Sequence, residues 1–158
     1  MMTTLSAKRL ATAGAALLAL SAFPARAQRP AGQSTLAVRV TGLRSDRGTV
    51  RLAVFCSPDG FPHQVGRACR TAAVSIQRGQ AKVVLDRLPS SRAIAIALVH
   101  DENGNGKMDT DWLGRPREGF GASNNPLPRR SAPRFDDARL TVTDARPRHE
   151  ISITARYR

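Results

Sequence analysis

Hydrophobic residues alternate with polar or small residues along most of the chain, which is the period of a β-strand with one buried face. The alternation predicts seven short strands, at residues 36–40, 50–54, 72–76, 81–85, 93–98, 140–142 and 151–155. No helical period occurs among them. The pattern therefore predicts an all-β fold, a seven-stranded antiparallel β-sandwich that forms one domain over residues 35–158.

The strand expected at residues 93–98 is the most apolar of the seven. Its large residues, Ile94, Ile96 and Leu98, share one face, and three alanines share the other. Small residues on the second face would let a neighbouring layer of the protein lie close to the sheet.

The first 27 residues have the pattern of a secretory signal peptide. Lys8 and Arg9 precede an apolar run at residues 10–20, and residues 25–27 read Ala-Arg-Ala, an A-x-A cleavage site. The alternative is a buried N-terminal helix. We expect a periplasmic or secreted protein with a short leader at residues 28–34 and no transmembrane segment after signal removal, because no later run is long enough.

The charge balance is strongly basic, with 25 Lys and Arg against 12 Asp and Glu and a net charge of +13. Almost all of this charge is arginine, which codon usage in a GC-rich genome would explain. The functional alternative is attraction to anionic envelope polymers or lipid head groups. Nucleic acid is not an expected partner, because only 4% of residues are aromatic and basic residues are not interleaved with stacking side chains.

Two cysteines, Cys56 and Cys69, flank a loop rich in proline and glycine. In an oxidising compartment such a pair predicts a disulfide, which closes a loop of about 14 residues and contributes about 3 kcal/mol. Metal binding and redox chemistry are weaker alternatives, because no C-x-x-C motif is present and a metal site needs more ligands.

Residues 101–136 show no sustained alternation and are rich in glycine, asparagine, proline and charge. A segment of this length without regular structure is uncommon in a compact domain, and such loops are usually functional or held in place. Residues 101–136 are therefore the first place to expect a functional site.

The start of this segment has the spacing of a calcium-binding loop. Oxygen donors stand at relative positions one, three, five and nine, a glycine at six, and a main-chain carbonyl at seven. The candidate Ca²⁺ ligands are Asp101, Asn103, Asn105, Lys107 (through its carbonyl) and Asp109. Short oxygen-bearing side chains at alternate positions can converge on one hard cation.

Position twelve, which a bidentate acid normally occupies, is Trp112. We expect Asp111, Glu118 or water to complete the coordination shell, and Trp112 to cover the ion site or join the core. Mg²⁺ fits less well, because it keeps several waters and requires strict octahedral geometry. The alternative without metal is a turn rich in Asn, Asp and Gly, residues that favour tight turns by themselves.

Candidate catalytic groups are sparse. His63, His100 and His149 lack metal-ligand spacing, and no G-x-S-x-G motif surrounds Ser123. His100 ends a strand, where histidine commonly bonds to a loop carbonyl. A small hydrolase that uses Glu118 or His100 as acid/base is the enzymatic alternative, but our primary expectation names no catalytic residue.

Arginines in and after the same segment form a candidate rim for an anionic ligand. The rim comprises Arg115, Arg117, Arg129 and Arg130. The alternative is a solvated basic face that keeps the protein soluble.

Three blocks, at residues 100–109 (HDENGNGKMD), 113–125 (LGRPREGFGASNN) and 133–138 (PRFDDA), resemble the domain of unknown function 2141 family of exported bacterial proteins. Arg115 and Ala122 depart from the family pattern, where Ile and Phe are commoner, but neither is a candidate ligand. The resemblance spans residues 36–157. It implies a secreted β-sandwich of transthyretin-like or immunoglobulin-like character, and no established activity.

The block at residues 101–109 is also similar to calcium loops in β-sandwich repeats of some bacterial surface proteins, which supports calcium by analogy alone. Together these observations predict a non-enzymatic exported module whose calcium-ordered loop, residues 101–118, presents a surface to a cell-envelope partner. An adhesin-like binder of anionic polysaccharide is a third hypothesis.

Overall fold

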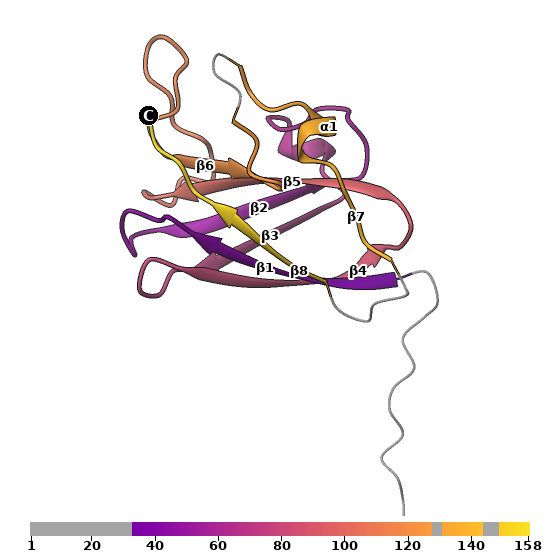
Figure 1. Ribbon diagram of the computed structural model, residues 1–158. Coiled ribbons are helices and arrows are strands. Elements are labelled where there is room, and N and C mark those ends of the chain that lie inside the picture. Colours follow the sequence, from indigo (N-terminus) through magenta and orange to yellow (C-terminus); the bar gives the residue numbers. More distant parts are fainter. Residues whose placement is uncertain (1–32, 128–130, 144–148) are drawn as a thin grey trace, which may run out of the picture.

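The computed structural model describes residues 33–127, 131–143 and 149–158. Over these residues the chain forms a β-sandwich of eight strands with one short α-helix, and Figure 1 shows the two sheets as layers. The strands are β1 (Gln33–Thr41), β2 (Thr49–Phe55), β3 (Arg70–Ser75), β4 (Ala81–Pro89), β5 (Ala93–Asp101), β6 (Gly119–Ala122), β7 (Leu140–Thr141) and β8 (His149–Thr154). The helices are a 3₁₀ turn, η1 (Val65–Arg67), and α1 (Phe135–Ala138).

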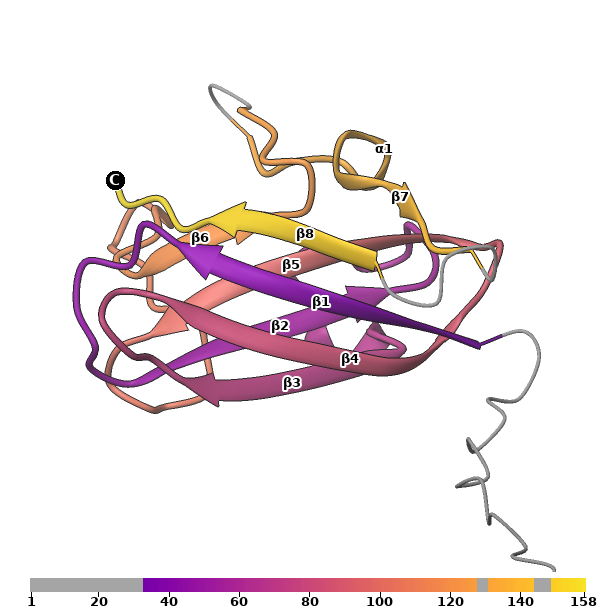
Figure 2. The ribbon, with the colours of Figure 1, turned by 60° about the horizontal axis from the view of Figure 1, so that its bottom comes forward.

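The smaller sheet has the order β4-β1-β8, and the larger has the order β3-β2-β5-β6 with β7 pairing to β5 (Figure 2). The prediction of a β-sandwich is confirmed. The prediction that it is wholly antiparallel is wrong, because β8 runs parallel to β1, with Val38 opposite Ile151. The preceding strand, β7, belongs to the other sheet, so β8 reaches β1 by a crossover and not by a hairpin.

The core between the sheets consists of the residues that the alternation selected. Leu36, Val38 and Val40 of β1 face the large residues of β2 and β5, and each of the three is at most 1% exposed. Ile94, Ile96 and Leu98 are buried to the same extent. Period-two burial thus follows directly from the sequence pattern.

A second apolar cluster covers the outer face of the larger sheet at Ala95 and Ala97. Helix α1 lies over this face (Figure 1), and Phe61 packs edge-on against Phe55 and Phe135, with ring centroids 5.3 and 5.9 Å apart. The expected close approach of a layer to the alanine face is confirmed. Helix α1 was not predicted because one turn is too short to show a helical period.

The segment at residues 101–136 is less irregular than predicted, since it contains β6 and the start of α1. Strand β6 pairs with β5, with Phe120 opposite Val99. The sequence pattern did not predict β6, because its glycines contribute no alternation of hydrophobic and polar side chains. A Cβ atom at Gly121 would lie 2.9 Å from the Thr154 carbonyl oxygen, so close packing requires glycine there.

Cys56 and Cys69 form the predicted disulfide, with their Cα atoms 5.9 Å apart. The bond joins the end of β2 to the start of β3 and encloses the loop that carries Phe61.

The expected signal peptide and most of the expected leader lie outside the described residues. Strand β1 begins at Gln33, inside the segment predicted as leader. In the described part of the chain, no helix is long and apolar enough to cross a membrane.

Candidate functional site

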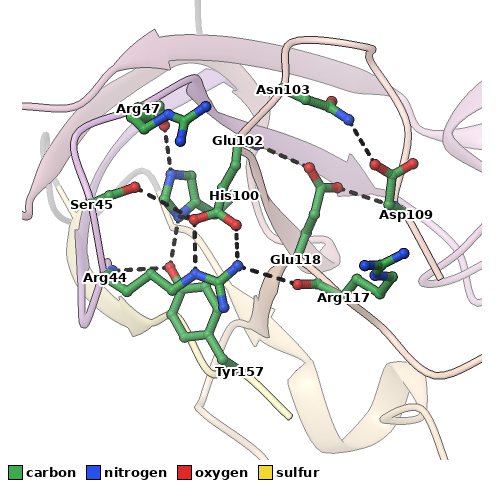
Figure 3. Close-up of polar contacts among 10 residues, drawn as sticks. All are labelled: Arg44, Ser45, Arg47, His100, Glu102, Asn103, Asp109, Arg117, Glu118 and Tyr157. Carbon is green, nitrogen blue, oxygen red and sulfur yellow. Dashed lines mark hydrogen bonds and ion pairs between the residues drawn. The ribbon is translucent and has the colours of Figure 1, made fainter. Parts of the chain in front are cut away.

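The candidate site lies where the chain leaves β5. The register of β2 and β5 places Thr49 opposite Asp101, so the loop before β2 and the loop after β5 emerge together. Figure 3 shows side chains from both loops and from the C-terminal segment meeting there. An open cleft of about 860 Å³ lies between them, lined in part by Arg44, Arg47, Glu102, Asp109, Arg117 and Glu118.

His100 anchors the base of the site and is fully buried. Its Nε2 lies 2.8 Å from the Arg47 carbonyl oxygen, and its Nδ1 lies 2.6 Å from the Tyr157 hydroxyl. Because a carbonyl only accepts, Nε2 donates to it, and in the neutral imidazole Nδ1 is then the acceptor for the tyrosine hydroxyl. The expected bond to a loop carbonyl is confirmed, and both ring nitrogens are occupied.

Tyr157 continues this network to the loop before β2. Its hydroxyl accepts a hydrogen bond from the Arg44 N–H at 3.1 Å, and the Arg44 guanidinium lies 4.5 Å from the centre of its ring. Burial raises the pKa of the Tyr157 hydroxyl. The C-terminal segment therefore fixes the position of Arg44 at the cleft.

Arg44 and Glu102 form a two-point ion pair at the mouth of the cleft (Figure 3). Arg44 Nε donates to Glu102 Oε1 at 2.8 Å, and its terminal nitrogen bonds to Oε2. The hydrogen bond from Arg44 holds the pKa of the Glu102 carboxyl below its ordinary value of 4.5. The pair joins the two loops across the site.

This pair predicts a pH dependence of stability. A carboxyl whose pKa is lowered on folding stabilises the native state above its unfolded pKa, and the stabilisation is lost as the pH falls through the folded value. The free energy of unfolding should therefore decrease below about pH 4.5. In Glu102→Gln this decrease should be smaller by about 1 kcal/mol. Urea unfolding at a series of pH values measures the difference.

Glu150→Gln is the matched control, since it removes only a long, exposed pair with Arg39 at 3.7 Å. The prediction would be contradicted if the free energy of unfolding fell with decreasing pH as steeply in Glu102→Gln as in the unsubstituted protein.

The predicted ligand loop is organised by its own side chains. The two carboxylate oxygens of Asp101, which is 1% exposed, accept hydrogen bonds from the Asn105 and Gly106 N–H groups at 3.1 and 2.8 Å. Asn103 Oδ1 accepts from Asn105 N–H at 3.1 Å, and Asn105 Oδ1 accepts from Lys107 N–H at 2.8 Å. These are successive Asx turns, which wind the backbone around the side chains.

Three of the candidate ligands converge on one point. Asn103 Nδ2 donates to one oxygen of Asp109 at 2.7 Å, and Asn105 Nδ2 donates to the other at 2.9 Å. The Asp109 carboxylate thus lies among groups from two earlier positions of the loop.

Glu118 holds the two ends of this loop together. Its carboxylate is buried, with Oε1 accepting from Glu102 N–H at 2.9 Å and Oε2 accepting from Asp109 N–H at 3.1 Å. Figure 3 shows it between these two residues. Glu118 therefore lies beside the loop and is bonded to both of its ends.

Asp111 has a different position. Its carboxylate accepts hydrogen bonds from Leu113 N–H, Arg115 N–H and Arg115 Nε within the hairpin at residues 110–116. It is not hydrogen bonded to the other candidate ligands among the described residues. The prediction that Trp112 covers the ion site or joins the core is wrong, because this turn holds its side chain 89% exposed.

The predicted basic rim is only partly assembled. Arg117 lines the cleft, Arg115 is paired with Asp111, and residues 129–130 lie outside the described part of the chain. Sequence reasoning missed Arg44 and Arg47, which lie far upstream and carry no motif. Only the pairing of β2 with β5 brings them to the site.

Within the described residues, no group of three or more His, Cys, Asp or Glu side chains is arranged to hold a metal ion. A cation would therefore need the asparagine and main-chain oxygens of the loop in addition to Asp101 and Asp109. The acid/base candidates of the hydrolase hypothesis, His100 and Glu118, both bond to the protein's own groups, so that hypothesis stays a prediction without support from the contacts.

A family model with the description "Uncharacterized protein conserved in bacteria (DUF2141)" matches residues 38–150. No curated protein and no solved structure matches the chain.

Proposed function

The chain belongs to the DUF2141 family of uncharacterised bacterial proteins, which supplies no activity, and we propose from the site that it is a non-enzymatic exported module with a calcium-ordered loop. In this proposal Ca²⁺ binds at residues 101–109. The ordered segment at residues 101–118 then presents a surface to an anionic component of the cell envelope.

The convergence of Asn103 and Asn105 on Asp109 carries the proposal. Both asparagine amides direct N–H groups at this carboxylate, in the place where a cation would balance its charge. Each Oδ1 accepts the main-chain N–H bond of its Asx turn and keeps a second lone pair, so in this proposal a side-chain shift that preserves the turn directs that lone pair at the cation. Two amide oxygens and a carboxylate would then face one centre.

Further oxygens support a complete shell. Each carboxylate oxygen of Asp101 and Glu118 accepts one hydrogen bond from a main-chain N–H and has a second lone pair, and Asp101 Oδ2 also lies 3.9 Å from the Arg51 guanidinium. The Lys107 carbonyl adds another donor at position seven. Ca²⁺ takes six to eight oxygens in flexible geometry, which suits this mixed set better than it suits Mg²⁺.

The charge around the loop supports an anionic partner. Arg47 and Arg117 line the cleft, and neither side chain forms an ion pair with a described residue. Exposed guanidinium groups bind carboxylate and phosphate groups through paired hydrogen bonds. With the net charge of +13, they favour association with anionic polymers or head groups.

Thermal unfolding in millimolar calcium and in chelator tests the ion. At a calcium concentration of about one hundred times the dissociation constant, binding should add about 2.7 kcal/mol to the free energy of unfolding. That corresponds to a rise of about 10 °C in Tm for a domain of this size. Asp109→Asn should abolish the rise, because it removes the charge at the centre of the ligand set.

Asp59→Asn is the control, because Asp59 pairs with Arg67 in the disulfide loop, away from the site. It should keep the full calcium response. An unsubstituted protein with the same Tm in calcium and in chelator, or a response that survives in Asp109→Asn, would reduce the motif to an Asx turn.

A further inference from the structure

The hairpin tip, residues 110–116, exposes two adjacent large hydrophobic side chains. Trp112 is 89% exposed and Leu113 is 54% exposed, and Trp112 is the most exposed large hydrophobic residue in the described part of the chain. The connection that carries them, between β5 and β6, extends from the body of the sandwich (Figure 1).

The tip is held in shape by polar atoms alone. Thr110 bridges to Pro116, Asp111 N–H donates to the Arg115 carbonyl at 2.8 Å, and the Asp111 carboxylate accepts the bonds described above. Neither Trp112 nor Leu113 contributes a side chain to this turn. The hairpin therefore presents the apolar pair without having to order on binding, which lowers the entropic cost of association.

Two arginines follow the apolar pair in the sequence. Arg115 lies two residues after Leu113 and neutralises Asp111, and Arg117 lies two residues further along. Within the hairpin Arg115 balances the charge of Asp111, and the positive charge beside the tip comes from Arg117, which forms no ion pair with a described residue. Tryptophan favours the membrane–water interface, and arginine beside it contacts anionic head groups while its stem lies on apolar surface.

We propose that the hairpin tip docks on an anionic phospholipid bilayer by inserting Trp112 and Leu113 into the interface, with Arg115 and Arg117 at the head groups. This inference deepens the proposed function, on which it rests for the choice of residues 101–118 as the interaction surface. It does not require calcium, because Asp111 and not the ligand loop holds the tip.

The shape of the tip favours a lipid surface over a protein partner. Protein interfaces centre their binding energy on a packed cluster with a surrounding rim of contacts. Here the other exposed large hydrophobics in the described residues lie on other elements: Val65 on η1, Val84 on β4 and Leu127 after β6. A protruding apolar pair followed by two arginines suits the interfacial region of an anionic bilayer.

The intrinsic fluorescence of the protein gives a direct test, because Trp112 is the only tryptophan of the chain. Vesicles of phosphatidylglycerol and phosphatidylcholine should shift its emission to shorter wavelength and protect it from iodide. Vesicles of phosphatidylcholine alone should do so much less, and added salt should weaken the effect.

Matched variants distinguish insertion of the hairpin tip from nonspecific adsorption of the protein to vesicles. Leu113→Ala should weaken apparent vesicle affinity about tenfold, whereas Leu127→Ala, at another exposed leucine, should not. Arg117→Gln should weaken it about fivefold. Arg92→Gln is the control, since that exposed residue lies before the opposite end of β5.

An unchanged Trp112 emission on anionic vesicles would overturn the proposal and leave a protein partner for the tip. So would co-sedimentation without a spectral change, which the apolar run at residues 10–20 could produce by itself. Measuring in calcium and in chelator separates the two proposals. Insertion in both conditions with no calcium effect on Tm would support the tip and reject the ion, and a calcium effect on Tm without insertion would support the ion and reject the tip.

Discussion

Gly48→Ala should destabilise the protein by at least about 4 kcal/mol, at the upper end of single substitutions. A Cβ atom at this position would lie 1.9 Å from the Asp101 carbonyl oxygen and 2.7 Å from the Glu102 Cα atom. Both contacts are with main chain at the end of β5, where a side-chain rotation cannot relieve them. The backbone of Gly48 also has φ of +73°, which disfavours any residue with a Cβ atom.

Gly114→Ala separates the clash from the backbone strain. Gly114 has the same φ of +73°, but no atom lies within 4 Å of the added Cβ. This variant should lose only about 1–2 kcal/mol, the cost of the left-handed conformation. Chemical denaturation of both variants gives the comparison. Equal losses would show that the loop before β2 can move away from Asp101.

Removing the disulfide with Cys56→Ala and Cys69→Ala should cost about 3 kcal/mol. The bond closes a loop of 13 residues in sequence separation, and on the chain-entropy model it restricts the unfolded chain by about that amount. The same loop places Phe61 between Phe55 and Phe135, so the aromatic cluster should loosen as well. Denaturant unfolding should show a lower midpoint for the double variant.

A reductant gives the internal control. Reducing the unsubstituted protein should lower its stability to about the level of the double variant, while the double variant should not respond. If the double variant were as stable as the oxidised protein, the disulfide would have no role in stability and the core alone would hold the loop.

The hydrophobic pattern was sufficient for the main body of the fold. Strands β1, β2, β4 and β5 alternate large residues with polar or small ones, and burial in a sandwich follows this period directly. The disulfide was also predictable, because only two cysteines are present. Strand β6 and helix α1 were missed because glycine contributes no hydrophobic alternation and a single helical turn cannot show a repeat.

The spacing of the loop at residues 101–109 favours contacts among its own side chains, because Asx turns between near neighbours are local. Asn103, Asn105 and Asp109 lie within seven residues of one another, and their side chains meet. The position of Glu118 depends instead on the pairing of β6 with β5, which brings it back beside the loop. The sequence did not predict that the Glu118 carboxylate joins the main chain of Glu102 to that of Asp109.

The sequence by itself determined a β-sandwich, its disulfide and a tight loop rich in Asp, Asn and Gly after β5, since these depend on short-range pattern. Tertiary structure alone decided that Arg44 and Arg47 line the cleft, because the pairing of β2 with β5 joins segments more than fifty residues apart. It also decided that Trp112 faces solvent. Whether a turn buries or exposes its tip depends on what lies above it in space, and local spacing carries no information about that.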